Sequence, residues 1–264
     1  MTDKRNNGAR PLILIGNDDG YNATGIKDLV TIARKFGDVV VASPLNHQSG
    51  KSCAITMDIP LRVKKITAEE GLTVYAISGT PSDCLKLALD QLLDGRVPDL
   101  VLSGINHGYN TGISTIYSGT MGVAFEGLVH HIPSVAFSYG SYKSEVDLSD
   151  CLPFVEKIIA RVLEKGLPRD ICLNVNFPEC EGGIKGLKVT TTDIGLWVGE
   201  FEKRTDPFGN DYYWMTGTYE QDDPNDHDTD IHWINQGYAT VTPVRVDQTA
   251  HDRIAAITKL IADN

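Results

Sequence analysis

The sequence is short of the features that mark membrane and secreted proteins. No apolar stretch approaches the roughly 18 residues of a membrane-spanning helix, and the polar segment from Met1 to Arg10 does not resemble a signal peptide. The cysteines are odd in number and lack any C-x-x-C pair, which favours reduced thiols in a cytoplasmic protein. They are Cys53, Cys84, Cys151, Cys172 and Cys180. We therefore expect a cytoplasmic protein with no membrane partner.

Positive charge is also scarce. The chain of 264 residues has 24 Lys and Arg against 35 Asp and Glu, a net charge of −11. This balance argues against nucleic acid as a partner, although a metal ion can still hold a small phosphate ester. The length fits a single large domain. We divide it into a core over residues 11–180, a β excursion over 187–243 and a C-terminal helix over 247–262.

Apolar patterning in the first two thirds of the chain alternates between strand and helix. Strands are expected at residues 12–16, 39–42, 53–57, 61–66, 72–77, 100–102, 135–137 and 173–177, the last of which closes the core. Helices are expected at residues 25–36, from Thr80 onward, and at 120–131 and 150–165. The second of these begins with an N-cap threonine, Thr80, followed by Pro81 at the first helical position and by Asp83 three residues after the cap. This rhythm predicts an α/β fold, a three-layer α/β/α, Rossmann-like, mainly parallel sheet with helices on both faces.

The last third differs because it is rich in Thr, Tyr and Trp. Residues 206–211 indicate a hairpin turn, so we expect a β-hairpin that projects from the core. Residues 249–261 predict a final amphipathic helix that begins with a capping box of Thr249 and Asp252. We expect some side chains of the hairpin and the helix to meet another subunit. These are Trp197, Phe201, Tyr212, Trp214, Ile257, Leu260 and Ile261.

The clearest sign of chemistry is Asn17-Asp18-Asp19-Gly20, directly after the apolar run of residues 12–16. Two adjacent carboxylates at the mouth of a buried strand are costly without a positive partner. Ligands of open α/β sheets lie beyond the carboxyl ends of the strands. The pattern therefore predicts a metal site at this edge, with an ordinary turn and a capping aspartate as the alternative.

Three further loops follow predicted core strands, at residues 46–52, 103–110 and 117–120. If the strands are parallel, these loops meet the two aspartates at one edge of the sheet. The convergent groups are then carboxylate, hydroxyl and amide oxygens, which favour Mg²⁺, Mn²⁺ or Ca²⁺ over zinc. The helix start in the last loop offers backbone N–H groups suited to phosphate, although an ordinary N-cap has the same sequence.

Five ordered motifs resemble those of the SurE family, the stationary-phase survival proteins. They are Asn17-Asp18-Asp19-Gly20, Ser43-Pro44 with Gln48-Ser49-Gly50, Ser78-Gly79-Thr80-Pro81 with Asp83 after an inserted Ser82, Ser103-Gly104-Ile105-Asn106 with Gly108 and Asn110, and Tyr117-Ser118-Gly119-Thr120. The resemblance extends from residue 12 to Pro243. One departure is Thr24, where such proteins often have proline, and a threonine can cap the same helix.

The resemblance implies a metal-dependent 5′-nucleotidase that hydrolyses nucleoside 5′-monophosphates and assembles as a homodimer or homotetramer. It implies one divalent ion, Mg²⁺ or Mn²⁺, with Ca²⁺ able to occupy the same site. The implied metal ligands are Asp18, Asp19, Ser49 and Asn106. The implied phosphate-binding residues are Asn110, Ser118, Gly119 and Thr120. Either Asp18 or Asp19 is also a candidate catalytic base.

Two other functions compete with this hypothesis. A non-catalytic, nucleotide-binding, oligomeric survival factor could use the same fold, because a fold does not prove an activity. Residues 48–52 mimic the end of a P-loop, but Leu45 stands in place of its first glycine, which makes a kinase the weaker alternative. His47 and His107 lie in the candidate loops. We expect the acidic stretch 220–230 to be a solvated loop rather than a calcium site.

Overall fold

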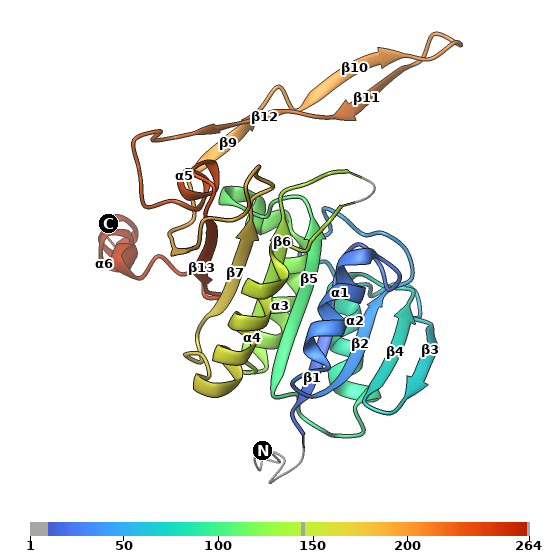
Figure 1. Cartoon of the computed structure of the whole chain (residues 1–264). Helices are drawn as coiled ribbons and strands as arrows, with labels where there is room; N and C mark the ends of the chain where they lie inside the picture. Colours follow the sequence, from blue (N-terminus) through green and yellow to red (C-terminus); the bar gives the residue numbers. More distant parts are fainter. Residues whose placement is uncertain (1–9, 144–145, 263–264) are drawn as a thin grey trace.

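The computed structural model describes residues 10–143 and 146–262, which form one central β-sheet covered by helices (Figure 1). The strands of this sheet are β1 (Leu12–Gly16), β2 (Asp38–Pro44), β3 (Val63–Glu69), β4 (Leu72–Ile77), β5 (Leu100–His107), β6 (Ser134–Tyr139), β7 (Cys172–Phe177), β8 (Leu187–Val189) and β13 (Ala239–Val244). The helices that cover it are α1 (Thr24–Ala33), α2 (Pro81–Leu87), α3 (Gly119–Val129) and α4 (Leu152–Lys165).

The layers follow the predicted α/β/α architecture. Helices α1 and α4 pack on one face of the sheet, and α2 and α3 on the other (Figure 1). The strand order is β3-β4-β2-β1-β5-β6-β7-β13-β8. Adjacent strands are parallel throughout the central run β4-β2-β1-β5-β6-β7. The prediction of a mainly parallel, three-layer sheet is confirmed.

The strand order creates a topological switch point between β1 and β5. Strand β1 pairs with β2 on one side, where Ile15 lies opposite Val41, and with β5 on the other, where Ile15 lies opposite Leu102. From β1 the chain builds the sheet outward in both directions, and ligands of such sheets bind at this point. All residues of β1 are buried, as expected of a strand covered on both faces.

The helix starts test the capping predictions. Thr80 caps α2 through a capping box with Asp83, and Pro81 occupies the first turn, as predicted. This helix ends at Leu87 and continues as a π-helical turn, η1 (Ala88–Leu92). The prediction that Thr24 caps α1 is wrong, because the chain is already helical at that residue and its side chain makes no capping bond.

Residues 53–57 do not form the predicted strand. They are irregular and mostly exposed. Thr56 is held on α2 instead, because its backbone N–H and its hydroxyl donate to the Asp83 carboxylate, at 2.9 Å and 2.6 Å. The edge strand β3 begins at Val63 and runs antiparallel to β4. The apparent alternation at 53–57 therefore comes from a loop whose polar groups bond to a helix.

A β-ribbon projects beyond the carboxyl edge of the sheet (Figure 1). Its base is formed by β9 (Gly195–Val198) and β12 (Thr218–Gln221), which pair antiparallel. Its tip is formed by β10 (Phe201–Thr205) and β11 (Asp211–Met215). The predicted projecting hairpin and its turn at residues 206–211 are confirmed. We refer to β9–β12 as the ribbon.

Strands β13 and β8 correct the interpretation of the second half. Strand β13 returns antiparallel to β7, with Thr240 opposite Asn176, and β8 pairs parallel to β13. Residues 172–177 are therefore not the last core strand, because the edge of β7 is covered by chain from within the stretch 187–243. Helix α5 (Asp230–Asn235), also not predicted, leads into β13.

The C-terminal helix is shorter than predicted. A 3-10 turn, η3 (His251–Arg253), precedes α6 (Ile254–Ala262), none of whose residues is buried. The predicted capping box does not form, because the Thr249 N–H donates to the Asp247 carboxylate at 2.9 Å. Among the helices in the described part of the chain, none has the length and apolar character that crossing a bilayer requires.

Candidate active site

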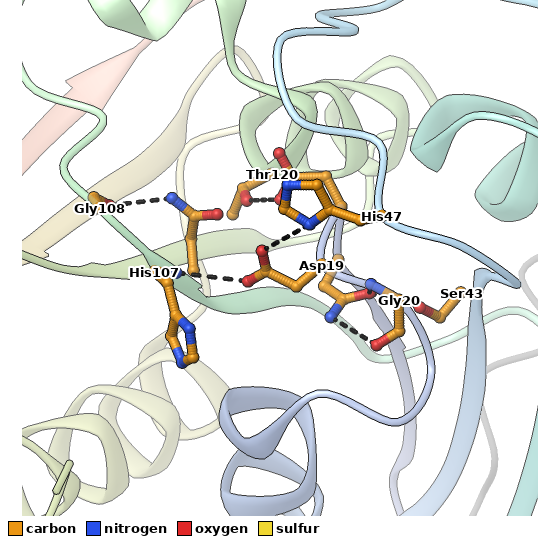
Figure 2. A network of polar contacts seen from close by, with 10 residues as sticks. Asp19, Gly20, Ser43, His47, His107, Gly108 and Thr120 are labelled. Atoms are coloured by element: carbon orange, nitrogen blue, oxygen red, sulfur yellow. Dashed lines mark hydrogen bonds and ion pairs between the residues drawn. The ribbon is translucent and has the colours of Figure 1, made fainter. Parts of the chain in front are cut away.

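Four loops meet at the switch point between β1 and β5 (Figure 2). The backbone N–H of Gln48, after β2, donates to the carbonyl of Asp18, after β1, at 2.7 Å. The His107 N–H at the end of β5 donates to the carboxylate of Asp19 at 3.3 Å. The Thr120 hydroxyl, at the start of α3, reaches Asp18 as well. The parallel strands thus bring these loops together as expected.

The turn that carries the two aspartates is shaped by Asn17. Its amide donates to the Gly20 carbonyl at 3.0 Å and accepts the Gly20 N–H at 3.2 Å. The Ser43 hydroxyl of β2 donates to the same amide oxygen. Gly20 has φ of +101°, a conformation that favours glycine. Asn17 therefore fixes the direction in which Asp18 and Asp19 leave the strand, a role that the sequence interpretation did not assign.

Asp18 is a buried carboxylate, only 3% exposed. Its Oδ1 atom accepts the hydroxyl proton of Thr120 at 2.5 Å. Burial raises the pKa of Asp18 to about 6, the Thr120 hydrogen bond opposes this rise, and the neighbouring Asp19 charge adds to it. A cation at this position would reverse the effect of burial and favour the ionised form.

Asp19 contacts two histidines in different ways. The Nδ1 atom of His47, whose side chain is 63% exposed, lies 3.3 Å from Asp19 Oδ1. His107 contacts Asp19 Oδ2 only through its backbone N–H, and its ring points away from the carboxylate (Figure 2). Its Nε2 atom is buried with no hydrogen-bond partner among the described residues. The structure thus places His47, and not the His107 ring, beside the carboxylates.

The start of α3 lies directly against Asp18. Ser118 is the N-cap, and its hydroxyl accepts the Met121 N–H at 3.0 Å. Gly119 has no room for a side chain, because a Cβ atom would lie 2.8 Å from the Asp18 Cβ and 3.0 Å from its Oδ2. The first N–H groups of a helix have no partners within it, so this end offers donors for an anion next to the carboxylates.

Asn106 and Ser49 are placed differently from each other. Asn106 is 6% exposed, and its Nδ2 donates to the Gly108 carbonyl at 2.9 Å. This orientation leaves its Oδ1 available as an oxygen ligand. Ser49, by contrast, is exposed. The backbone N–H of Gln48 donates to the Asp18 carbonyl and so holds the loop of Ser49 near the site.

Asn110 belongs to a buried polar network that the sequence interpretation missed. Its N–H donates to Asn176 Oδ1 and its Nδ2 to Ser138 Oγ, both at 2.8 Å. Its carbonyl accepts from Asn174 Nδ2 at 2.8 Å. The sequence did contain a signal for this network. Asn174 and Asn176 alternate with apolar residues in a strand expected to be covered on both faces, where two polar side chains need partners. These side chains fix the loop that precedes α3.

The donor set fits a hard divalent cation. Within the described residues no three His, Cys, Asp or Glu side chains come together, so the two carboxylates need neutral oxygens to complete a ligand set. The amide of Asn106 and the hydroxyl of Ser49 are of the required kind. Carboxylate, amide and hydroxyl oxygens suit Mg²⁺, Mn²⁺ and Ca²⁺. Adjacent buried carboxylates also carry the negative charge that a cation balances.

Comparison with known proteins gives consistent matches over most of the chain. A family model described as "Survival protein SurE" matches residues 13–198. A Phocaeicola vulgatus protein named 5′-nucleotidase SurE is 42% identical over 243 residues, 92% of this chain and 93% of the relative. A Bacteroides thetaiotaomicron protein of the same name is 44% identical over the same coverage. The crystal structure of SurE protein from Aquifex aeolicus matches with a TM-score of 0.81 and 35% identity, over 95% of this chain and 99% of that one.

Proposed function

Because this chain belongs to the SurE family, we propose that it is a metal-dependent phosphatase that hydrolyses nucleoside 5′-monophosphates to nucleoside and phosphate. The observation that carries this proposal is the pair of adjacent, nearly buried carboxylates beside a helix N-terminus. Asp18 is 3% exposed and the Asp19 side chain 8%. A purely structural turn has little use for two such charges at a ligand-binding edge.

The proposed ligands of the cation are Asp18, Asp19, Ser49 and Asn106. When bound, a divalent cation supplies Lewis-acid polarisation of the phosphoryl group and a lowered pKa for the attacking water. The oxygen donors favour Mg²⁺ or Mn²⁺, and Ca²⁺ suits the same donors. Ser49 is exposed, and the bond of its neighbour Gln48 to the Asp18 carbonyl keeps its loop beside the two aspartates.

The protein residues then have separable roles. The start of α3, with Ser118, Gly119 and Thr120, binds the phosphate through backbone N–H groups and meets the charge that develops during transfer. Asn110 lies on the adjacent loop. Both aspartates are candidate bases.

The exposed apolar side chains support a homo-oligomer, dimer or tetramer. At the ribbon tip, Trp214 is 58% exposed and Met215 73%. In α6, Leu260 is 75% exposed and Ile261 74%. Burying such surface stabilises by roughly 25 cal/mol per Å², and contiguous exposed apolar faces mark interaction sites. A second copy of the chain is the partner that we propose for both faces.

Phosphate release from a panel of nucleoside 5′-monophosphates tests the proposal. We expect release with Mn²⁺ or Mg²⁺, and its loss when a chelator removes the metal. Binding of nucleotides without phosphate release at saturating metal would instead identify a non-catalytic nucleotide-binding factor. Phosphate transfer from ATP would indicate a kinase. The structure argues against a kinase, because the chain after Ser52 is irregular where a P-loop requires a helix.

A further inference from the structure

Two buried carboxylates lie at the base of the ribbon, outside the candidate active site. Asp230, the first residue of α5, is fully buried, and Asp193, in the loop before β9, is 1% exposed. Asp230 lies in the stretch expected to be a solvated loop, so that expectation is wrong for this residue. Buried carboxylates are costly unless hydrogen bonds satisfy them. Their partners therefore show which segments they hold together.

Asp230 accepts three backbone hydrogen bonds. Its Oδ1 accepts the N–H of Asp193 at 3.1 Å and the N–H of Ile231 at 2.9 Å. Its Oδ2 accepts the N–H of Gly112 at 2.9 Å. The carboxylate of Asp230 thus ties the segment that enters the ribbon to the segment between β5 and α3. Gly112, in the latter segment, precedes Asp230 by 118 residues in the sequence.

Asp193 continues this connection into the ribbon. Its Oδ1 accepts the Tyr219 hydroxyl proton at 3.0 Å, and its Oδ2 accepts from the Gln221 amide at 2.5 Å. Both donors belong to β12. The Tyr219 ring packs edge-on against Trp197 of β9, with 5.7 Å between the ring centroids. Both strands of the ribbon base are therefore linked to the carboxylate pair.

Gly112 is the point at which the ribbon base contacts the loop. It has φ of +53°, and a Cβ atom there would lie 2.8 Å from the Tyr219 hydroxyl and 3.2 Å from Ile231 Cδ1. Glycine alone meets both requirements without strain. Because no side chain of residue 112 separates Tyr219 from the loop, a displacement of Tyr219 acts directly on the backbone of Gly112.

This loop carries proposed phosphate-binding residues on both sides of Gly112. Asn110 precedes it, and the Asn110 carbonyl accepts the Thr115 hydroxyl at 3.0 Å across a 3-10 turn, η2 (Gly112–Tyr117). Ser118, the cap of α3, follows that turn. A shift of Gly112 therefore moves the segment between the two groups.

We propose that Asp230 and Asp193 are positioning residues that couple the ribbon to the phosphate-binding loop, residues 110–118. Through Tyr219, the position of the ribbon sets the position of the groups that bind phosphate. The catalytic part of this inference rests on the proposed function. The mechanical coupling rests on the hydrogen bonds alone, so the two parts are tested separately.

The substitution Asp230→Asn tests the link to the loop. The carboxamide keeps the shape but offers one oxygen to three N–H donors. In the full-length protein we expect the KM for AMP and the inhibition constant of inorganic phosphate to rise about tenfold, with the calorimetric affinity for Mn²⁺ unchanged. Asp228→Asn, at an exposed neighbour, is the matched control and should change none of these. A loss of Mn²⁺ affinity along with phosphate affinity would reveal a merely damaged fold and overturn the positioning role.

The substitution Tyr219→Phe tests the link to the ribbon. It removes the hydroxyl that Asp193 accepts but keeps the ring beside Trp197. We expect the same two constants to rise by about threefold, less than in Asp230→Asn, because the Gln221 amide still donates to Asp193 and the three N–H groups still donate to Asp230. Tyr213→Phe, on the exposed tip of the ribbon, is the matched control. Equal behaviour of the two tyrosine variants would overturn the coupling.

Hydrogen–deuterium exchange tests the coupling without any assay of activity. Asp230→Asn and Tyr219→Phe should both raise exchange in a peptide spanning residues 110–118 and leave β1 protected. Wild-type exchange in Tyr219→Phe would overturn the coupling. Increased exchange in a protein that releases no phosphate from nucleotides would support the coupling and refute the proposed function, so the two failures are distinguishable.

Discussion

The hydroxyl of Thr120 donates to Asp18 Oδ1 at 2.5 Å and so joins the start of α3 to the end of β1. A proposed phosphate-binding residue is thereby bonded to a proposed metal ligand. The side chain of Thr120 orients the carboxylate of Asp18, and the backbone N–H of Thr120 remains for the phosphate. The two halves of the candidate site are consequently held in one fixed relation.

Removing this hydroxyl should lower turnover more than metal affinity. For Thr120→Ala we expect kcat to fall about tenfold, because a hydrogen bond to a charged group contributes about 1.5 kcal/mol. Thr120→Ser keeps the hydroxyl and should recover most of the activity. If Thr120→Ala weakens Mn²⁺ binding as much as Asp19→Asn does, the residue belongs to the metal site and its assignment to phosphate is wrong.

Asp18→Asn should remove one of the two negative ligands. We expect kcat/KM to fall by more than the roughly 10–100-fold typical of residues that only support a metal ligand. The assay is phosphate release at saturating Mn²⁺, with the exposed Asp94→Asn as a charge-matched control. Near-normal turnover of Asp18→Asn under these conditions would exclude the carboxylate as a ligand.

A methyl group at Gly119 should disturb Asp18 without unfolding the protein. The added Cβ would lie 2.8 Å from the Asp18 Cβ, and relieving such a contact costs about 1–3 kcal/mol. We expect Gly119→Ala to keep its circular dichroism spectrum but lose tenfold or more in activity. Gly95→Ala, where nothing lies within 4 Å, carries backbone strain alone and should stay active. Full activity of Gly119→Ala would show that the close contact is unimportant.

Asp230 should make stability depend on pH. Burial raises its pKa from 3.8 to about 6, so between these values the folded protein binds a proton that the unfolded chain does not. The resulting stabilisation is full below pH 3.8 and is lost as the pH rises through 6. Relative to Asp230→Asn, the wild-type free energy of unfolding should fall by about 2 kcal/mol from about pH 4.5 to about pH 7. Urea titrations at equal protein concentration measure this, and a pH-independent difference would contradict it.

Static light scattering tests the oligomer. We expect the full-length chain to be a dimer or tetramer at micromolar concentration, because the ribbon and α6 leave apolar side chains exposed. A chain that ends at Asp247 should form an oligomer of fewer subunits if α6 contributes to an interface. An unchanged number of subunits would place the interface on the ribbon, and a monomeric full-length protein would rule out both faces.

Local patterns in the sequence were enough to predict several elements of the site. The apolar run of β1 and the aspartates after it, the capping box at Thr80 and the helix start at Ser118 all depend on neighbours within a few residues. Such interactions are visible in sequence because hydrophobic period and capping chemistry act over one or two helical turns. The exceptions are Thr24 and Thr249. The N-cap of α1 is Ala23 rather than Thr24, and the backbone N–H of Thr249 donates to Asp247 rather than to Asp252.

The sequence by itself determined that two carboxylates follow a buried strand, and that the chain builds a parallel sheet whose loops meet. Only the tertiary structure decided which partners these groups find. The bond from Gly112 to Asp230 spans 118 residues, and β13 reaches β7 after the chain has passed through the ribbon. Pairings of this kind depend on how distant segments pack, so no local pattern specifies them. Burial then made Asp230 a structural anchor, although its sequence neighbours belong to an exposed acidic loop.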